Sequence, residues 1–312
     1  MTVPEDKIII LFNPSAGKGK ALKSKGRLER LLKTWQVPFE LIVTASEENL
    51  RALTRECAGR HRAVAGAGGD STFQIMIEEI VRSEAEVDFG LIALGSSNDV
   101  AREFGLHSLG KACQALKRRR KRSIDLGAVE HDGEILKYFI GQANVGLGVY
   151  VNRYVQEISE RRPRLASFQG LAGTLGIIRS YRRKEVPLSL SVRAGEQKKD
   201  GSYVVANFSN IRFWASGKTL NPAARPDDGR LDGCLIGRCS FLRLAQLAFL
   251  ARKGRHVGAP EVEFLRGPVY EIAAEQEFEV QADGEIIGGS GTPVFFKKVL
   301  IRAVPRALRL IC

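Results

Sequence analysis

The first 130 residues alternate between short apolar runs of strand length and longer segments with helical spacing. The apolar runs occupy residues 8–12, 39–44, 62–66 and 89–95, and a helical pattern follows each of them. Strands that are apolar along nearly their whole length are typical of a parallel sheet with helices on both faces. We therefore expect an α/β domain over residues 1–130.

The pattern changes near Ser123. The later segments are short, rich in β-forming residues and separated by Gly, Asp and Asn, which is typical of antiparallel strands joined by turns. Two helical stretches interrupt them, at about residues 150–184 and 241–253. The sequence thus predicts a second, mostly antiparallel domain over residues 131–303, with the boundary near residues 125–135.

Three glycine-bearing polar loops follow three of the predicted parallel strands. They are "NPSAGKGKA" (13–21), "GAGGD" (66–70) and "LGSSND" (94–99). Ligands bind beyond the carboxyl ends of the strands in such sheets, and bare backbone amides there can hold a phosphate. The first loop lacks the spacing of a Walker A motif, and by itself it could be a simple turn. Three such loops together favour a nucleotide site.

Asp70 needs a separate explanation, because a carboxylate next to a phosphate repels it. It fits if it acts through Mg²⁺ or water, or if it accepts a proton from an attacking hydroxyl. A helix is expected to begin near Thr72, so Asp70 could also be an ordinary N-cap. Asn98 or Asp99 is a plausible cap for the next helix.

The formal net charge of +13 suggests an anionic partner. Basic clusters occur at residues 117–122, 161–164, 179–184 and 252–255. They can be solvated helix ends or a surface for lipid head groups. No aromatic-interleaved recognition pattern accompanies them, so nucleic acid is not expected as a partner. The apolar stretches "LAGTLGII" and "FLRLAQLAFLA" precede the last two clusters, and they either pack inside the domain or dip into a membrane surface.

The five cysteines are scattered and without CxxC spacing, which favours reduced thiols in the cytoplasm over a zinc site. The N-terminus resembles no secretory signal, and no apolar run is long enough to span a bilayer. We expect a cytoplasmic protein that associates peripherally with a membrane.

Several motifs, in this order and spacing, resemble those of the diacylglycerol kinase catalytic family, which includes bacterial lipid kinases and sphingosine and ceramide kinases. They are "NPSAGKGKA", "GGDST", "LGSSNDVAREFGL", "SIDLGAV", "NPAARPDDGRLDGCLIG", "QADGE" and "PRALRLI". The resemblance implies an α/β nucleotide-binding domain like that of NAD kinase and phosphofructokinase, followed by an antiparallel β-sandwich. It also implies that residues 304–312 return to the first domain. The implied activity is transfer of a phosphoryl group from ATP, with Mg²⁺, to a lipid hydroxyl.

The same resemblance implies roles for individual residues. The ATP contacts would be Asn13, Pro14, Ser15, Ala16, Gly17, Thr44, Gly68, Gly69, Asp70, Ser71, Thr72, Phe73, Gln74, Ser96 and Asn98. Asp70, Asp99 and Asp125 are similar to the acids of a Mg²⁺–water network, and Arg225, Asp228 and Arg230 match a second, structural Mg²⁺ site. Asp283 and Glu285 stand where the family has its general base and a metal-linked acid, and Asp70 is a further candidate for the base.

Two positions depart from the family pattern. Ser71 replaces the usual glycine of GGDGT, and a serine would be strained by about 1 kcal/mol or more if that position had a positive φ. "GSSND" replaces GTGND, which is a milder change.

Two alternatives to a lipid kinase remain open. One is an enzyme like NAD kinase, which shares the GGDxT loop. The other is a non-catalytic regulator that binds lipid or nucleotide, because Ser71 replaces the usual glycine. The expected partners are ATP, a lipid and an anionic membrane surface, and a homodimer is an open alternative.

Overall fold

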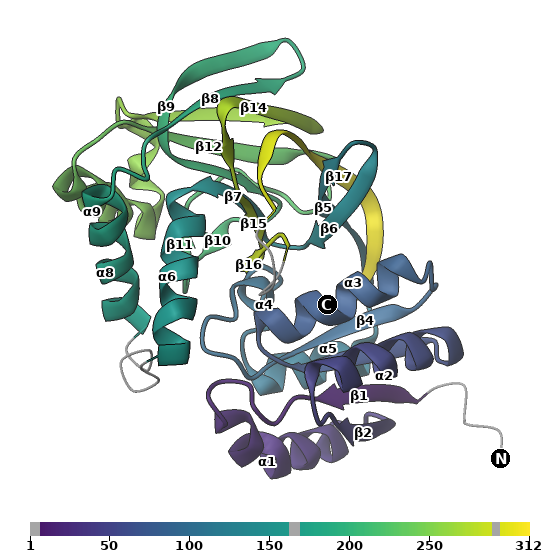
Figure 1. The fold of residues 1–312 in the computed structure, drawn as a ribbon. Coiled ribbons are helices and arrows are strands. Elements are labelled where there is room, and N and C mark those ends of the chain that lie inside the picture. Colours follow the sequence, from purple (N-terminus) through teal and green to yellow (C-terminus); the bar gives the residue numbers. More distant parts are fainter. Residues whose placement is uncertain (1–6, 162–168, 289–293) are drawn as a thin grey trace.

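The computed structural model describes residues 7–161, 169–288 and 294–312. Its first part follows the predicted alternation of strands and helices (Figure 1). The elements are β1 (Ile8–Phe12), α1 (Lys20–Thr34), β2 (Phe39–Val43), α2 (Glu47–Arg60), β3 (Ala63–Gly68), α3 (Asp70–Arg82), β4 (Asp88–Ala93), α4 (Asp99–Glu103) and α5 (Leu109–Arg118).

The four strands pair in parallel in the order β2-β1-β3-β4. Every residue of β1 is buried, and successive side chains point to opposite faces of the sheet. Ile9 and Leu11 belong to the hydrophobic cluster that includes residues of α2 and α3. Ile8 and Ile10 belong to the cluster that includes residues of α1 and α5. Two covered faces explain why the strand is apolar along its whole length.

The second part is mostly antiparallel. Its elements are β5 (Lys121–His131), β6 (Glu134–Phe139), β7 (Gln142–Gly146), α6 (Leu147–Arg161), α8 (Gln169–Arg182), β8 (Leu188–Ala194), β9 (Gln197–Ser209), β10 (Phe213–Trp214), β11 (Lys218–Thr219), β12 (Leu231–Gly237), α9 (Phe241–Leu250), η1 (Ala251–Lys253), η2 (Arg255–Gly258), β13 (Val262–Gly267), β14 (Val269–Phe278), β15 (Val280–Ala282), β16 (Glu285–Ile286) and β17 (Phe296–Ile311). Within the helical stretch expected at residues 150–184, the described residues on either side of the gap at 162–168 form α6 and α8, which pack against each other.

The long strand β17 belongs to both parts of the sheet. Its first half pairs antiparallel with β14, and β5 runs antiparallel along most of its length. At its end, Arg309–Ile311 pair in parallel with Asp88–Gly90 of β4. The last residues of the chain therefore lie beside the parallel strands, and one sheet continues from the first part into the second.

The predicted fold class is confirmed: a parallel sheet flanked by helices precedes an antiparallel β-rich part. Among the helices that the structure describes, none has the length and hydropathy to cross a membrane.

Two of the four basic clusters are partly neutralised by ion pairs. In the cluster at residues 117–122, Lys121 pairs with Asp88 and Arg122 with Asp227, both at 2.6 Å. In the cluster at residues 179–184, Arg179 pairs with Glu157 at 2.6 Å. The cluster at residues 161–164 lies outside the residues whose side chains the structure describes.

Candidate active site

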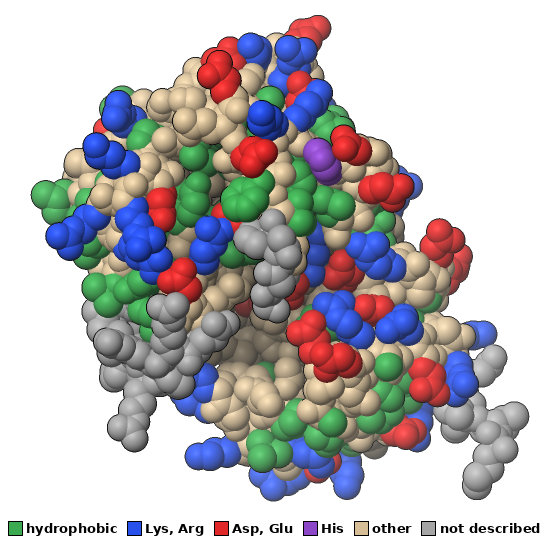
Figure 2. Space-filling view, viewed as in Figure 1, with side chains coloured by type: hydrophobic (Ala, Val, Ile, Leu, Met, Phe, Trp, Pro, Cys, Tyr) green, Lys and Arg blue, Asp and Glu red, His purple; other side chains and the backbone are tan. Residues whose placement is uncertain are grey.

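A cavity of about 470 Å³ lies at the carboxyl ends of β1, β3 and β4, where they face the second part of the chain. The space-filling view in Figure 2 shows a hollow between the two bodies of the molecule. One side of the cavity is formed by the loops that follow the three parallel strands. The other side comes from β7, β10 and the turn after β15.

Glycines bring the loops of the first side close together. Gly17 has φ +60°, and a Cβ there would lie 2.6 Å from the carbonyl oxygen of Leu94. A Cβ on Gly95 would lie 2.5 Å from the Cα of Gly69. Any larger residue would push these backbones apart. The side chain of Asn13 adds a direct link, because its Nδ2 donates to Thr72 Oγ1 at 3.0 Å.

Asp70 links two of the loops. Its Oδ2 accepts from the backbone N–H of Asp99 at 3.1 Å, and its Oδ1 accepts from that of Val100 at 3.2 Å. Asp70 therefore caps α4, whereas the N-cap position of its own helix α3 is Gly69. Burial, and to a smaller extent the nearby charge of Asp99, raise the pKa of Asp70 to about 6.

The strain expected at Ser71 is absent. Ser71 lies in the first turn of α3, which begins at Asp70, slightly before the expected start near Thr72, and it is not among the residues with positive φ. Its side chain is exposed in the wall of the cavity. The condition for strain, a positive φ at this position, is not met, because the helix has already started at residue 71.

Asn98 occupies the N-cap position of α4 but does not cap it with its side chain. Its φ is +54°, and its side-chain amide makes two hydrogen bonds of 2.9 Å to the backbone of Gly95. Asn98 thus holds the loop after β4 in a closed shape. The capping role falls to Asp70.

Asp99 connects the first part of the chain to the hairpin of β10 and β11. Its Oδ2 accepts from the backbone N–H of Ser216 at 2.9 Å, and Ser97 Oγ lies 3.0 Å from Ser216 Oγ. Asp99 is buried, and its Oδ1 has no hydrogen-bond partner among the described residues. This orphan oxygen next to the cavity is available to a cation or to a water molecule.

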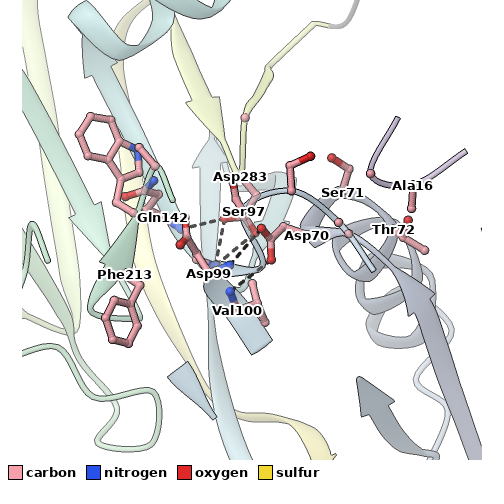
Figure 3. A pocket seen from close by; sticks show the side chains of 18 of the residues that line it. Ala16, Asp70, Ser71, Thr72, Ser97, Asp99, Val100, Gln142, Phe213 and Asp283 are labelled. Atoms are coloured by element: carbon pink, nitrogen blue, oxygen red, sulfur yellow. Dashed lines mark hydrogen bonds between the residues drawn. The ribbon is translucent and has the colours of Figure 1, made fainter. Parts of the chain in front are cut away.

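Asp283 enters the cavity from the opposite side, and Figure 3 shows it close to Asp70. Its carboxylate accepts from the backbone N–H groups of Ile140, Gly141 and Gln142 at 2.8 to 3.2 Å. Burial raises its pKa to about 6 against the opposing effect of these hydrogen bonds, and the charge of Asp70 adds to the increase. Two carboxylates from distant parts of the chain thus meet in one cavity.

Glu285 lies only two residues further along but does not line this cavity. Its Oε2 is 2.5 Å from Lys137 Nζ, and the same ammonium group lies 2.9 Å from Glu78 of α3. Lys137 is buried, and its two ion pairs link β16 to α3. Glu285, Lys137 and Glu78 line a separate cavity, and the role expected for Glu285 stays a prediction.

Nine of the fifteen predicted ATP contacts line the cavity: Asn13, Ser15, Ala16, Gly17, Gly69, Asp70, Ser71, Thr72 and Ser96. The others do not. Thr44 is buried, and its hydroxyl donates a hydrogen bond to the carbonyl oxygen of Phe12. Phe73 lies in the hydrophobic core, and the side-chain amide of Gln74 donates to the carbonyl oxygen of Tyr138. Pro14 and Asn98 lie in the loops after β1 and β4, and Gly68 ends β3, but none of the three lines the cavity.

The residues predicted for metal binding are separated. Asp70 and Asp99 lie at the cavity, but the buried Asp125 accepts from the backbone N–H groups of Gly229 and Arg306 away from it. Asp228 accepts from the N–H of Arg230 and pairs with Arg266, while Arg225 lines a different cavity. No group of three or more acidic, His or Cys side chains suited to a metal ion occurs among the described residues. The second Mg²⁺ site stays a prediction.

Apart from Asp283, the residues of the opposite wall were not predicted from the sequence. Gln142 of β7 and Gln281 of β15 line the cavity, together with Ile211 and the aromatic pair Phe213 and Trp214. The adjacent aromatic residues in "NIRFWASG" are an unusual feature for a turn-rich segment and were the only available signal. Asn207 donates to Gln142 Oε1 at 2.7 Å, so the amide group of Gln142 has a fixed orientation.

Comparison with known proteins agrees with this arrangement. Residues 7–129 match the family model of the diacylglycerol kinase catalytic domain. Residues 141–312 match the model of the YegS C-terminal NAD kinase beta sandwich-like domain. Together the two models cover almost the whole chain.

Similar curated proteins come from several bacteria. A diacylglycerol kinase of Mycobacterium tuberculosis strain H37Rv is 27% identical over 308 residues, covering 98% of this chain and 94% of the relative. A protein of Pseudomonas aeruginosa PAO1 named "Probable lipid kinase YegS-like" is 28% identical over 272 residues, covering 86% and 82%. A crystal structure of a diacylglycerol kinase from Bacillus anthracis has the same fold, with a TM-score of 0.70, 14% identity, and coverage of 99% of this chain and 98% of that one.

Proposed function

Because the chain belongs to the family of bacterial diacylglycerol kinases and YegS-like lipid kinases, we propose that it transfers the γ-phosphoryl group of ATP to the hydroxyl of diacylglycerol or a related lipid. The observation that carries the proposal is the meeting of Asp70 and Asp283 in one cavity with three glycine-bearing loops. We further propose that residues 1–130, with 304–312, bind ATP and that residues 131–303 bind the lipid at a membrane surface in the cytoplasm.

The phosphates of ATP would bind at the loops after β1 and β3. The first turn of α3 offers unpaired backbone N–H groups and the positive end of the helix dipole to an anion. Ser71 and Thr72 lie in this turn, and Ser15 to Gly17 line the same side of the cavity. Gly17 and Gly69 allow the backbone to come close to the phosphate oxygens.

Mg²⁺ fits the acids on this side of the cavity. It retains several waters and usually binds one or two carboxylates together with substrate phosphates, so a cage of protein ligands is not required. The orphan Oδ1 of Asp99 and the carboxylate of Asp70 would hold the ion, directly or through water. When bound, the ion would neutralise phosphate charge.

The proton of the acceptor hydroxyl needs a base. Asp283 is the candidate that lines the cavity, and a pKa of about 6 leaves it ionised at neutral pH yet more basic than an ordinary carboxylate. As the acceptor oxygen bonds to the γ-phosphorus, the bond from that phosphorus to the bridging oxygen breaks, ADP leaves, and the proton passes to the carboxylate. Asp70, with a similar pKa, is the second candidate for the base.

The acceptor would approach along the wall formed by the second part of the chain. Ile211, Phe213 and Trp214 offer apolar contact there, and Gln142 and Gln281 offer amide groups to a polar head. An apolar wall with a few fixed polar groups suits a lipid whose hydroxyl is near its polar end.

The test is a phosphorylation assay with purified protein, labelled ATP and Mg²⁺. Separate reactions contain diacylglycerol, other lipid alcohols, a bacterial lipid extract, and NAD. Label in a lipid product, absent with Asp70→Asn, would support the proposal. Label only in NADP would favour the NAD kinase alternative. No transfer to any acceptor, despite ATP binding, would favour a regulator.

A further inference from the structure

Helix α9 has apolar side chains on two opposite faces. Leu244 and Leu247 are buried in a cluster with Cys234 and Ile236 of β12. Leu242 and Phe249 point away from it and are 78% and 68% exposed, the highest values for large hydrophobic side chains in the described part of the chain. Their separation of seven residues places them on one stripe of the helix. Val257, which follows in η2, is 46% exposed.

Three exposed cations lie between Phe249 and Val257. They are Arg252, Lys253 and Arg255. No ion pair to a carboxylate is found for them within the described ranges, in contrast to Arg243 on the same helix, which pairs with Glu261 at 2.9 Å. The guanidinium of Arg252 lies 5.7 Å from the centroid of the Phe249 ring. We call these six residues, Leu242, Phe249, Arg252, Lys253, Arg255 and Val257, the α9 surface.

The α9 surface adjoins the wall of the cavity. The turn η1, which contains Arg252 and Lys253, contacts β11. β11 pairs with β10, and both residues of β10, Phe213 and Trp214, line the cavity. Lys218 of β11 lies 5.9 Å from the ring of Trp214. Burial, and after it the positive charge of Arg252, lower the pKa of Lys218, which agrees with the closeness of the two cations.

We propose that the α9 surface docks the protein on an anionic membrane, with Leu242 and Phe249 in the interface and the three cations at the lipid head groups. The proposal rests on the proposed function, because a kinase without a described membrane-spanning helix must reach a hydroxyl at the bilayer. Apolar side chains flanked by unpaired cations are typical of such surfaces. Figure 2 shows hydrophobic and basic side chains side by side at the edge where Figure 1 places α9.

The charge pattern favours a membrane over a second copy of the chain. If two copies met through this surface, each would bring Arg252, Lys253 and Arg255 toward the same three cations of the other. Like charges at a contact oppose association. An anionic leaflet instead neutralises all three.

The experiment compares two variants with a matched control. One variant is Leu242→Ser with Phe249→Ser, and the other is Arg252→Gln with Lys253→Gln and Arg255→Gln. The control, Leu22→Ser with Val43→Ser, removes two hydrophobic side chains, 58% and 47% exposed, from α1 and β2. Binding is measured by sedimentation with vesicles of phosphatidylcholine alone and of phosphatidylcholine mixed with phosphatidylglycerol. Circular dichroism and thermal unfolding establish that each variant is folded.

The wild-type protein and the control should bind the anionic vesicles, and more weakly as salt rises. Each α9 variant should bind roughly tenfold less tightly or worse. Unchanged binding by both folded variants would overturn the proposal. The proposal would also be overturned if light scattering showed that the wild type is a dimer and that the α9 variants are monomers.

Kinase assays separate this proposal from the proposed function. A short-chain diacylglycerol dispersed in water should be phosphorylated equally by the wild type and the α9 variants, whereas long-chain lipid in anionic vesicles should be phosphorylated about tenfold more slowly by the variants. Loss of turnover on both substrates would place the α9 surface in the catalytic machinery and overturn docking. If the wild type phosphorylates no lipid, the proposed function fails, and vesicle binding still decides on the surface.

Discussion

Asp70 accepts a hydrogen bond from the backbone N–H of Asp99, which is 29 residues further along the chain. The same carboxylate binds the N–H of Val100, so it fixes the start of α4 while it faces the cavity. One side chain thus combines a structural role with a position beside the proposed phosphates. The effects of replacing it must be separated by two measurements.

Replacing Asp70 by Asn should lower phosphoryl transfer by about 100-fold or more, because the carboxylate that holds Mg²⁺ or water is lost. The amide oxygen of Asn can still accept a hydrogen bond from the start of α4. Steady-state kinetics measure the loss, and circular dichroism establishes that the fold persists. Near-normal turnover by the folded variant would leave Asp70 with its capping role alone.

The same variant should change how stability depends on pH. The folded-state pKa of Asp70, about 6, is above the value of 3.8 for an ordinary aspartic acid. The folded protein therefore holds the proton of Asp70 more tightly than the unfolded chain does, and this proton binding raises the free energy of unfolding. The contribution is fully present below the unfolded pKa and is lost as pH rises through 6. As the pH rises from 4 to 8, the free energy of unfolding of Asp70→Asn should therefore increase relative to that of the wild type. Urea unfolding at both pH values measures this, and a constant difference would contradict it.

Activity should fall as pH drops below about 6, because Asp283 becomes protonated there and cannot accept the proton of the acceptor. The measurement is a profile of kcat/KM for the lipid, at saturating ATP and Mg²⁺. A mid-point near the ordinary value of 3.8 would show that no carboxyl of raised pKa limits the reaction.

Glu285 and Lys137 should act as a unit. Each of Glu285→Gln and Lys137→Met breaks the ion pair between Lys137 of β6 and Glu285 of β16. If Glu285 influences the reaction through Lys137, the double variant should be about as active as the more impaired single variant. Additive losses in kcat would instead indicate that Glu285 acts on the reacting groups independently.

Gly17→Ala should raise the KM for ATP, because the new Cβ would lie 2.6 Å from the carbonyl oxygen of Leu94 and the backbone has a positive φ. Gly26→Ala is the matched control. Gly26 lies within α1 with nothing within 4 Å of a Cβ, so alanine should stabilise the protein by up to about 1 kcal/mol and leave the KM unchanged. Equal KM values for both variants would show that the loop after β1 does not contact ATP.

Ser71→Gly offers no relief of strain, because the positive φ on which such strain depends is absent at Ser71. Ser71 is helical, so glycine should lower the free energy of unfolding by a few tenths of a kcal/mol, with turnover near that of the wild type. Urea unfolding and steady-state kinetics measure the two effects. A large loss of turnover would reveal a contact made by the Ser71 hydroxyl.

The amino-acid sequence by itself determined the alternation of strands and helices and the three glycine-bearing loops at the carboxyl ends of the strands. These features depend on backbone periodicity and on the conformational freedom of glycine, which are local properties. Asp70 could be singled out because it is a carboxylate directly after the glycines of a predicted phosphate-binding loop. The partners of each carboxylate could not be derived, because they come from segments far apart in the chain.

The tertiary structure alone decided how Asp283 and Glu285 differ. They are two residues apart, but Asp283, with φ +46°, turns to the amides of residues 140–142, while Glu285 turns to Lys137. In α9, packing against β12 buries Leu244 and leaves Leu242 exposed, although the sequence pattern gave both the same apolar character. Burial and electrostatic environment depend on which surfaces meet, and only the folded arrangement of β12, β15 and β17 specifies that.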